Sequence, residues 1–162
     1  MDIVPTHKLY ANTTKQFATW YFHWFFLIQD APLPETLIQN NTTFALREWA
    51  FKGIPKEVIP EDIFQEYLKH FSDPTTLHAM CEDYRAGATI DLEHDETDLT
   101  TKVSCPVLVL WGSRGAMDPL FNVLETWKER ASQVSGKSLP CGHWMAEQLP
   151  EEVTAEVRQF LK

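Results

Sequence analysis

Val107-Leu108-Val109-Leu110-Trp111 forms a continuous apolar run that is rich in β-branched residues and is bounded by a proline and a glycine. This pattern is typical of a strand that is buried on both faces in a parallel sheet. The sequence after it predicts a helix over about 120–131, an extended segment over 133–139 and a final helix over 151–160. Such an alternation indicates an α/β architecture. Because two strands alone do not make a stable parallel sheet, we expect most of that sheet to lie elsewhere.

The sequence before this strand, from about His7 to Glu96, predicts a region of helices only. Apolar residues recur there at three- and four-residue spacing, and prolines interrupt the pattern. The first helix is expected over about 7–29 and is apolar around most of its circumference, so other segments must cover it on several sides. Shorter helices are expected near 43–51, 61–71 and 74–86.

The composition argues against several classes of protein. With 162 residues, 44% of them hydrophobic, the chain is long enough for one folded domain. A formal net charge of -9 without a basic stripe argues against nucleic acid and anionic membrane as partners. The most apolar stretch, Phe17 to Ile28, is too short to span a bilayer. The three cysteines show no disulfide or zinc spacing and no secretory leader is visible, so we expect a cytoplasmic protein.

The strongest candidate for chemistry is the Gly142-His143 pair, which follows the last expected strand and precedes the final helix. Glycine gives the backbone conformational freedom, and a loop at the C-terminal end of a strand can project an imidazole into an active site. The alternative is a loop histidine that only caps the final helix. The position favours a catalytic His143.

A second candidate group consists of His23 and Trp24 on the first expected helix and Tyr84 on a later one. Imidazole N–H, indole N–H and phenol O–H groups are hydrogen-bond donors, so together they could hold a halide or an oxyanion in a dry pocket. From spacing alone, ordinary core packing explains these three residues better.

A catalytic histidine also needs a carboxylate that holds its tautomer and stabilises the imidazolium. Asp2 lies at an expected strand end, and Asp118 lies after the Val107–Trp111 strand. A surface or capping role is the alternative for each, and position alone favours Asp118. The acidic residues between Asp91 and Asp98 are expected to form a solvated charged run.

A series of motifs, in order along essentially the whole chain, closely resembles the haloacetate (fluoroacetate) dehalogenases of the α/β-hydrolase fold, which are related to the epoxide hydrolases. The motifs are Asp2-Ile3-Val4-Pro5-Thr6, Tyr21-Phe22-His23-Trp24-Phe25-Phe26, Ala31-Pro32-Leu33-Pro34-Glu35, Met80-Cys81-Glu82-Asp83-Tyr84-Arg85-Ala86-Gly87-Ala88, Glu93-His94-Asp95, Val109-Leu110-Trp111-Gly112 and Cys141-Gly142-His143. The resemblance implies the C-terminal part of an α/β-hydrolase fold. Residues 1–6 would end a core strand that carries the triad acid, 7–96 would form a helical lid (cap), and 97–162 would complete the core.

In that family an aspartate on a nucleophile elbow displaces halide to form an ester, which a histidine-activated water then hydrolyses. The resemblance implies that His143 is the base and that Asp2 is the triad acid, which overturns the positional preference for Asp118. It implies that the halide-binding residues are His23, Trp24 and Tyr84. The implied reactants are a small haloacid and water, without metal or other cofactor, and we expect the site residues to surround one cavity.

The resemblance does not extend to the nucleophile. The family's nucleophilic aspartate, carboxylate-binding arginines and oxyanion loop lie in an N-terminal half, and this sequence contains no Gly-x-Ser-x-Gly or Gly-x-Asp elbow. We therefore expect a truncated gene model, a pseudogene product or an internal start, with an exposed apolar strand edge. An epoxide hydrolase-like enzyme, with Tyr84 donating to the oxirane oxygen, and a catalytically inactive fragment or interaction module remain alternatives. The resemblance also permits a homodimer.

Overall fold

The computed structural model describes residues 2–162, and the chain divides into two compact units. The sheet unit comprises Met1–Trp20 and Leu92–Lys162, and the helical unit comprises Tyr21–Asp91. A helical lid over 7–96 stays a prediction. Among residues 2–162, no helix is long and apolar enough to cross a membrane.

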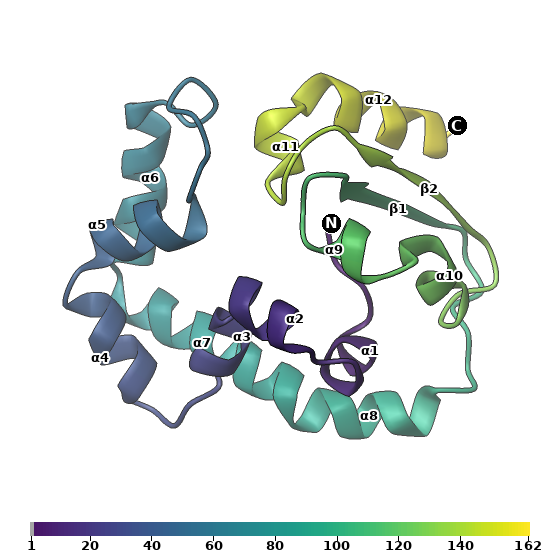
Figure 1. Cartoon of the computed structure of the whole chain (residues 1–162), viewed down its shortest axis with the longest axis horizontal. Coiled ribbons are helices and arrows are strands. Elements are labelled where there is room, and N and C mark those ends of the chain that lie inside the picture. The colour runs from purple at the N-terminus through teal and green to yellow at the C-terminus, as the bar shows by residue number, and fades with distance from the viewer. Residues whose placement is uncertain (1) are drawn as a thin grey trace. The chain divides into compact units, whose positions relative to one another are not determined.

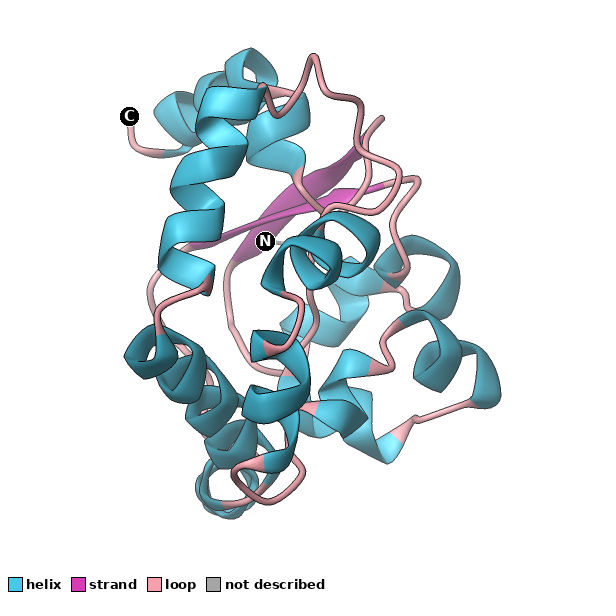
Figure 2. Cartoon of the chain, turned by 90° about the vertical axis from the view of Figure 1, so that its left-hand side faces the viewer, coloured by secondary structure: helices cyan, strands magenta, loops and turns pink. Residues whose placement is uncertain are grey.

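The sheet unit is organised around two parallel strands, β1 (Val107–Gly112) and β2 (Val134–Leu139). Their register pairs Val107 with Val134 and Gly112 with Leu139. Val109 and Leu110 point to opposite faces of β1 and are both buried, which confirms the prediction of a strand covered on both sides. Figure 2 shows the two strands side by side.

Short helices connect and cover these strands. The crossover from β1 to β2 contains α9 (Met117–Leu120) and α10 (Val123–Lys128), and the chain after β2 forms α11 (Met145–Gln148) and α12 (Pro150–Phe160). α12 lies on one side of the strands and α10 on the other (Figure 1). The core on the α11 side consists of Leu110, Leu139, Cys141 and Met145.

The first predicted helix, over 7–29, is wrong in extent. Instead of one long helix, the structure has α1 (Thr6–Ala11), α2 (Lys15–Trp20) and α3 (His23–Phe26). Polar side chains near the first break bind the backbone: Asn12 donates to the Lys8 carbonyl at 2.8 Å, and Thr14 accepts from the Phe17 amide at 3.1 Å. Such local hydrogen bonds compete with those of a continuous helix.

The helical unit contains α3, four helical segments that follow it, and α7. The bounds are α4 (Leu33–Gln39), α5 (Thr42–Ala45), a π-helix η1 (Leu46–Ala50), α6 (Glu61–Phe71) and α7 (Pro74–Ala88). Asp73 caps α7 by accepting from the Thr76 amide at 2.8 Å. A core of Leu27, Ile38, Leu77 and Cys81 holds α3, α4 and α7 together.

The acidic run that was expected to be solvated forms most of α8 (Ile90–Asp98), and its side chains are largely exposed. Asp95 is the exception, because the Arg130 guanidinium donates to it at 2.8 Å. The run therefore combines a solvated helix face with one ion pair inside the sheet unit.

Candidate active site

The side chains of Asp2 and His143 meet in the sheet unit. Asp2 is 1% exposed, and its Oδ2 lies 3.2 Å from Nδ1 of His143. Its other oxygen, Oδ1, accepts a hydrogen bond from the Gly112 amide at 3.1 Å. Because a carboxylate can only accept, Nδ1 must carry a proton, and in the neutral ring Nε2 then has the lone pair that a general base needs. The imidazole is half exposed, so a water molecule can reach it.

The ends of β1 and β2 bring these two residues together. The carboxyl ends of parallel strands meet at one edge of a sheet, which places Gly112 beside the loop that carries His143. A β-carbon at Gly112 would lie 2.3 Å from the carbonyl oxygen of Gly142, so only glycine fits at this strand end. The Asp2 segment is held by the Trp127 indole, which donates to the Ile3 carbonyl at 3.0 Å.

Further contacts fix the histidine loop, and the sequence did not reveal them. Gln148 accepts from the Gly142 amide at 2.9 Å, and the Arg114 amide donates to the Cys141 carbonyl at 2.9 Å. A β-carbon at Gly115 would lie 2.6 Å from Oδ2 of Asp2, so this glycine leaves room for the carboxylate. A Gln six residues after a glycine has no recognisable spacing signal, whereas the Gly112 to Gly115 turn after a buried strand could have drawn attention.

Asp118, the competing carboxylate, is engaged elsewhere. Its Oδ1 accepts a hydrogen bond from the indole of Trp111 at 2.6 Å. The carboxylate that the structure brings to His143 is Asp2, in agreement with the family resemblance and not with position along the chain. The catalytic roles of both residues remain predictions.

The three predicted halide-binding residues, His23, Trp24 and Tyr84, lie together inside the helical unit. The Tyr84 ring on α7 makes edge-on contacts with His23, at 5.9 Å between centroids, and with Trp24, at 5.8 Å. The Trp49 ring from η1 lies 5.6 Å from His23 and was not foreseen from the sequence. The three predicted donors therefore share one aromatic cluster, which both core packing and anion binding would require.

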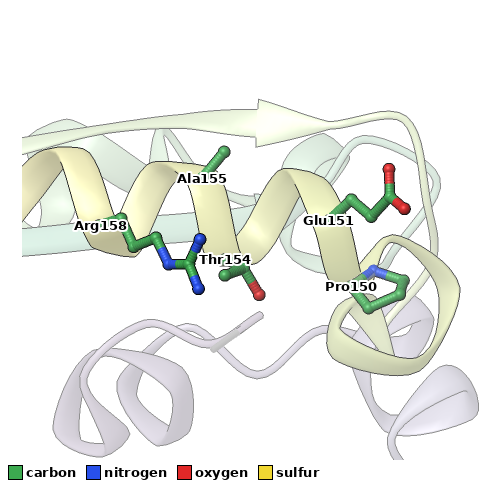
Figure 3. A pocket seen from close by; sticks show the side chains of 5 residues that line it. All are labelled: Pro150, Glu151, Thr154, Ala155 and Arg158. Carbon is green, nitrogen blue, oxygen red and sulfur yellow. The ribbon is translucent and has the colours of Figure 1, made fainter.

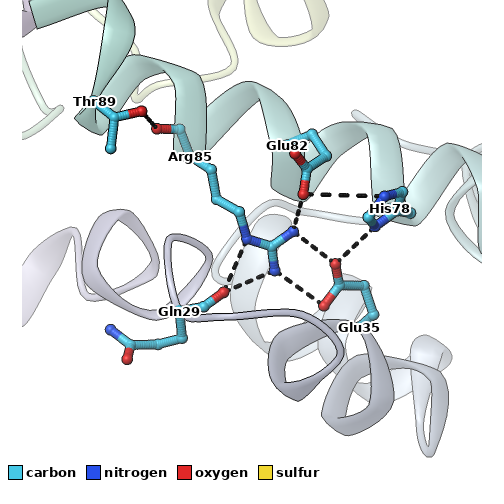
Figure 4. Close-up of polar contacts among 6 residues, drawn as sticks. All are labelled: Gln29, Glu35, His78, Glu82, Arg85 and Thr89. Carbon is cyan, nitrogen blue, oxygen red and sulfur yellow. Dashed lines mark hydrogen bonds and ion pairs between the residues drawn. The ribbon is translucent and has the colours of Figure 1, made fainter.

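Next to this cluster, the side chain of Arg85 is the centre of a charged network (Figure 4). Its guanidinium binds Glu35 through two hydrogen bonds of 2.9 and 3.1 Å and contacts Glu82 at 2.5 Å. The hydrogen bonds from Arg85 are the main reason that the pKa of Glu35 falls to about 2. Burial of Glu35 acts in the opposite direction and is outweighed.

Glu35, His78 and Glu82 have ligand atoms within 4.8 Å of one another, close enough to be considered as a metal site. The donor set does not fit a cation, because Arg85 occupies both oxygens of Glu35 and one of Glu82. A guanidinium at this position supplies the positive charge that a metal would bring. We assign the group to an ion-pair network.

Two other features carry no catalytic chemistry. Burial raises the pKa of the Cys81 thiol to about 11, which leaves it protonated and a poor nucleophile. A shallow hollow of about 330 Å³ on α12 contains none of the predicted site residues; it is lined by Pro150, Glu151, Thr154, Ala155 and Arg158 (Figure 3). One helix face supplies all five, so the hollow is not an enclosed binding site.

Known proteins match this chain in both sequence and fold. It is 39% identical over 165 residues to fluoroacetate dehalogenase from Burkholderia sp., a match that covers 99% of this chain and 54% of that protein. A solved structure from Nostoc sp. PCC 7120, assigned to the α/β-hydrolases, has a TM-score of 0.95 and 53% identity and is covered over 56% of its length. The chain is homologous to part of an α/β-hydrolase. No protein-family model matches it.

A third comparison extends the α/β-hydrolase assignment. A Pseudomonas aeruginosa protein assigned as an epoxide hydrolase, solved with bound MFA, has a TM-score of 0.86 and 34% identity over 99% of this chain. The chain spans about half the length of these relatives, 54% to 56%. The predicted fold class, part of an α/β-hydrolase, is therefore confirmed, as is the resemblance to the dehalogenases and epoxide hydrolases.

Proposed function

We propose that this chain supplies the base and the halide-binding residues of a haloacetate dehalogenase-type hydrolase, which cleaves the carbon–halogen bond of a small 2-haloacid. The observation that carries the proposal is the contact between Oδ2 of the buried Asp2 and Nδ1 of His143, at 3.2 Å. The identity to fluoroacetate dehalogenase supports the same substrate class.

The reaction needs an attacking carboxylate on a nucleophile elbow, and residues 2–162 contain no such motif. In the proposed reaction this carboxylate comes from a segment that corresponds to the part of the relatives that this chain does not match. That carboxylate forms a C–O bond to the substrate carbon while the C–halogen bond breaks and halide leaves with the bonding electrons. His143 Nε2 then takes a proton from water, and the resulting hydroxide adds to the ester carbonyl. The C–O bond between the hydroxy acid and the ester carbonyl carbon breaks, and the departing alkoxide takes the proton from His143. The carboxylate is restored when its remaining proton passes to solvent.

In the first step negative charge builds up on the departing halogen. We propose that His23, Trp24 and Tyr84 stabilise it, because their N–H and O–H groups are hydrogen-bond donors in a largely apolar setting. The shared aromatic cluster of these residues supports this assignment. Trp24 is 8% exposed, so the residue lies largely out of water.

Epoxide hydrolysis is the second candidate function. The Pseudomonas aeruginosa relative assigned as an epoxide hydrolase favours it, and the Tyr84 hydroxyl could donate to an oxirane oxygen. The His23 and Trp24 pair instead favours halide, because an epoxide opening needs a donor at the oxygen and has no halide to hold. A catalytically inactive interaction module is the third candidate.

The test joins the N-terminal part of the Burkholderia sp. fluoroacetate dehalogenase to this chain and measures fluoride release from fluoroacetate. Dehalogenase function predicts continuous fluoride release, which in His143→Ala falls to at most one fluoride per polypeptide. Release of a diol from styrene oxide without fluoride from fluoroacetate would replace the proposal by the epoxide alternative. A cooperatively melting polypeptide inactive on both substrates would support the interaction module.

A further inference from the structure

Arg85 connects the helix that carries Tyr84 to the segment that follows His23 and Trp24. Its Nε and Nη2 donate to the backbone carbonyl of Gln29 at 2.9 and 2.8 Å. Gln29 is in turn tied to α3, because its side chain donates to the Phe25 carbonyl at 2.7 Å. A guanidinium on α7 is thus fastened, through Gln29, to α3.

The same guanidinium also binds a third element, α4. Glu35 accepts from Nη1 and Nη2 with separate oxygens, at 2.9 and 3.1 Å. The side chains of Arg85 and Glu35 are only 16% and 9% exposed, so solvent screens the pair weakly. A paired, planar contact of this kind fixes orientation as well as distance.

Apolar packing alone would not fix the position of Tyr84. Leu27, Leu77 and Cys81 hold α3 against α7, but burial of apolar surface is non-directional and tolerates small slides and rotations of a helix. Tyr84 and Arg85 are adjacent, so their side chains leave α7 about 100° apart, and the hydrogen bonds of Arg85 set the rotation that aims Tyr84.

We infer that Arg85, held by Glu35, is a positioning residue that sets the placement of the Tyr84 hydroxyl relative to the His23 and Trp24 donors. This inference rests on the proposed function and deepens it. In it, the Arg85–Glu35 ion pair controls halide affinity although neither residue is one of the three halide donors. Arg85 does not touch the halide. Its effect passes through the register of α7 against α3.

The test measures halide binding and ring contact separately in the full chain. Bromide, titrated as its sodium salt at constant ionic strength, is followed by the indole N–H NMR signal of Trp24, assigned by Trp24→Phe. Ring contact without halide is followed by the nuclear Overhauser effect between Tyr84 and Trp24. The variant is Arg85→Lys, which keeps the charge and loses the paired hydrogen bonds, and Glu35→Gln is measured in the same way.

The matched control is Arg47→Lys, because Arg47 also binds both oxygens of a glutamate, Glu61, in the helical unit, at 3.1 and 2.8 Å. We expect Arg85→Lys to weaken bromide binding by at least roughly tenfold and to reduce the Tyr84–Trp24 effect, since small misplacements of a binding group are costly. Arg47→Lys should change neither. The bromide affinity and ring contact of Glu35→Gln should lie between those of the two variants, because the hydrogen bonds from Arg85 to Gln29 remain.

A cooperatively melting Arg85→Lys chain with unchanged ring contact and bromide affinity would overturn the inference, and so would an equal loss in Arg47→Lys. If Arg85→Lys does not fold, Glu35→Gln decides by the same two readouts. If the unmodified chain shows no bromide-dependent shift, the halide role in the proposed function fails, and the ring contact in the variants still decides whether Arg85 sets the register.

Discussion

Asp2 and His143 are 141 residues apart in the chain, and their side chains meet at 3.2 Å between Oδ2 and Nδ1. The contact orients the imidazole, because Asp2 is buried and its second oxygen is held by the Gly112 amide. A histidine so held has one ring nitrogen committed to the carboxylate, and proton transfer would pass through the other.

The first prediction concerns the tautomer of His143. In the neutral imidazole the proton should sit on Nδ1, and Asp2→Asn should abolish this preference because an amide can donate as well as accept. The ¹⁵N chemical shifts of the two ring nitrogens report the tautomer. An Asp2→Asn chain with an unchanged tautomer population would show that the carboxylate does not orient the ring.

The second prediction concerns Gly115. Gly115→Ala should push the Asp2 carboxylate away from His143, because the new β-carbon would lie 2.6 Å from Oδ2. We expect a loss of stability of about 1–3 kcal/mol, typical of overpacking, together with loss of the tautomer preference. Gly87→Ala is the control: nothing lies within 4 Å of its β-carbon, and alanine favours a helix. Urea denaturation that ranks the two variants equally would contradict the steric argument.

The third prediction concerns Gly136, at the centre of β2. An alanine β-carbon there would lie 1.8 Å from the carbonyl oxygen of Val109 on β1, and the glycine has a φ of 152°. Gly136→Ala should lower the free energy of unfolding by at least about 2 kcal/mol, because backbone must move to relieve the contact. Ser135→Ala, at an exposed neighbour on the same strand, should have little effect. Thermal melting of both variants checks the difference.

The fourth prediction is a pH dependence. Because Arg85 lowers the pKa of Glu35 from 4.5 to about 2, Glu35 stabilises the fold above pH 4.5, and this contribution is lost as the pH falls toward 2. The free-energy difference between the unmodified chain and Glu35→Gln should therefore shrink across this range. Its size at neutral pH should be on the order of 1–3 kcal/mol, as for hydrogen bonds to charged groups. A difference that does not change with pH would contradict the assigned pKa.

Much of the sheet unit could be predicted from the sequence, because strong local patterns determine its elements. The apolar run from Val107 gave β1 within one residue of its end, and the segment expected over 133–139 is β2, Val134–Leu139. The long helix over 7–29 was wrong because side chains such as Asn12 bind the backbone locally, which apolar periodicity does not register.

The candidate site was predictable only in part. His143 was identifiable from its glycine neighbour and its place after a strand. Its partner was not, because no spacing rule links Asp2 to a residue 141 positions away, and only the family resemblance selected it over Asp118. Trp49 and the Arg85–Glu35 pair were missed because tertiary packing brings them to the cluster.

The central claim is that His143, held by Asp2, is the base that completes the reaction. Its most direct test is mass spectrometry of this chain joined to the N-terminal part of the Burkholderia sp. fluoroacetate dehalogenase. After exposure to fluoroacetate, the His143→Ala form should retain a carboxymethyl ester on the attacking aspartate, because nothing activates water to remove it. The unmodified form should not accumulate it. Continued fluoride release over many turnovers by His143→Ala, without a trapped ester, would contradict the account.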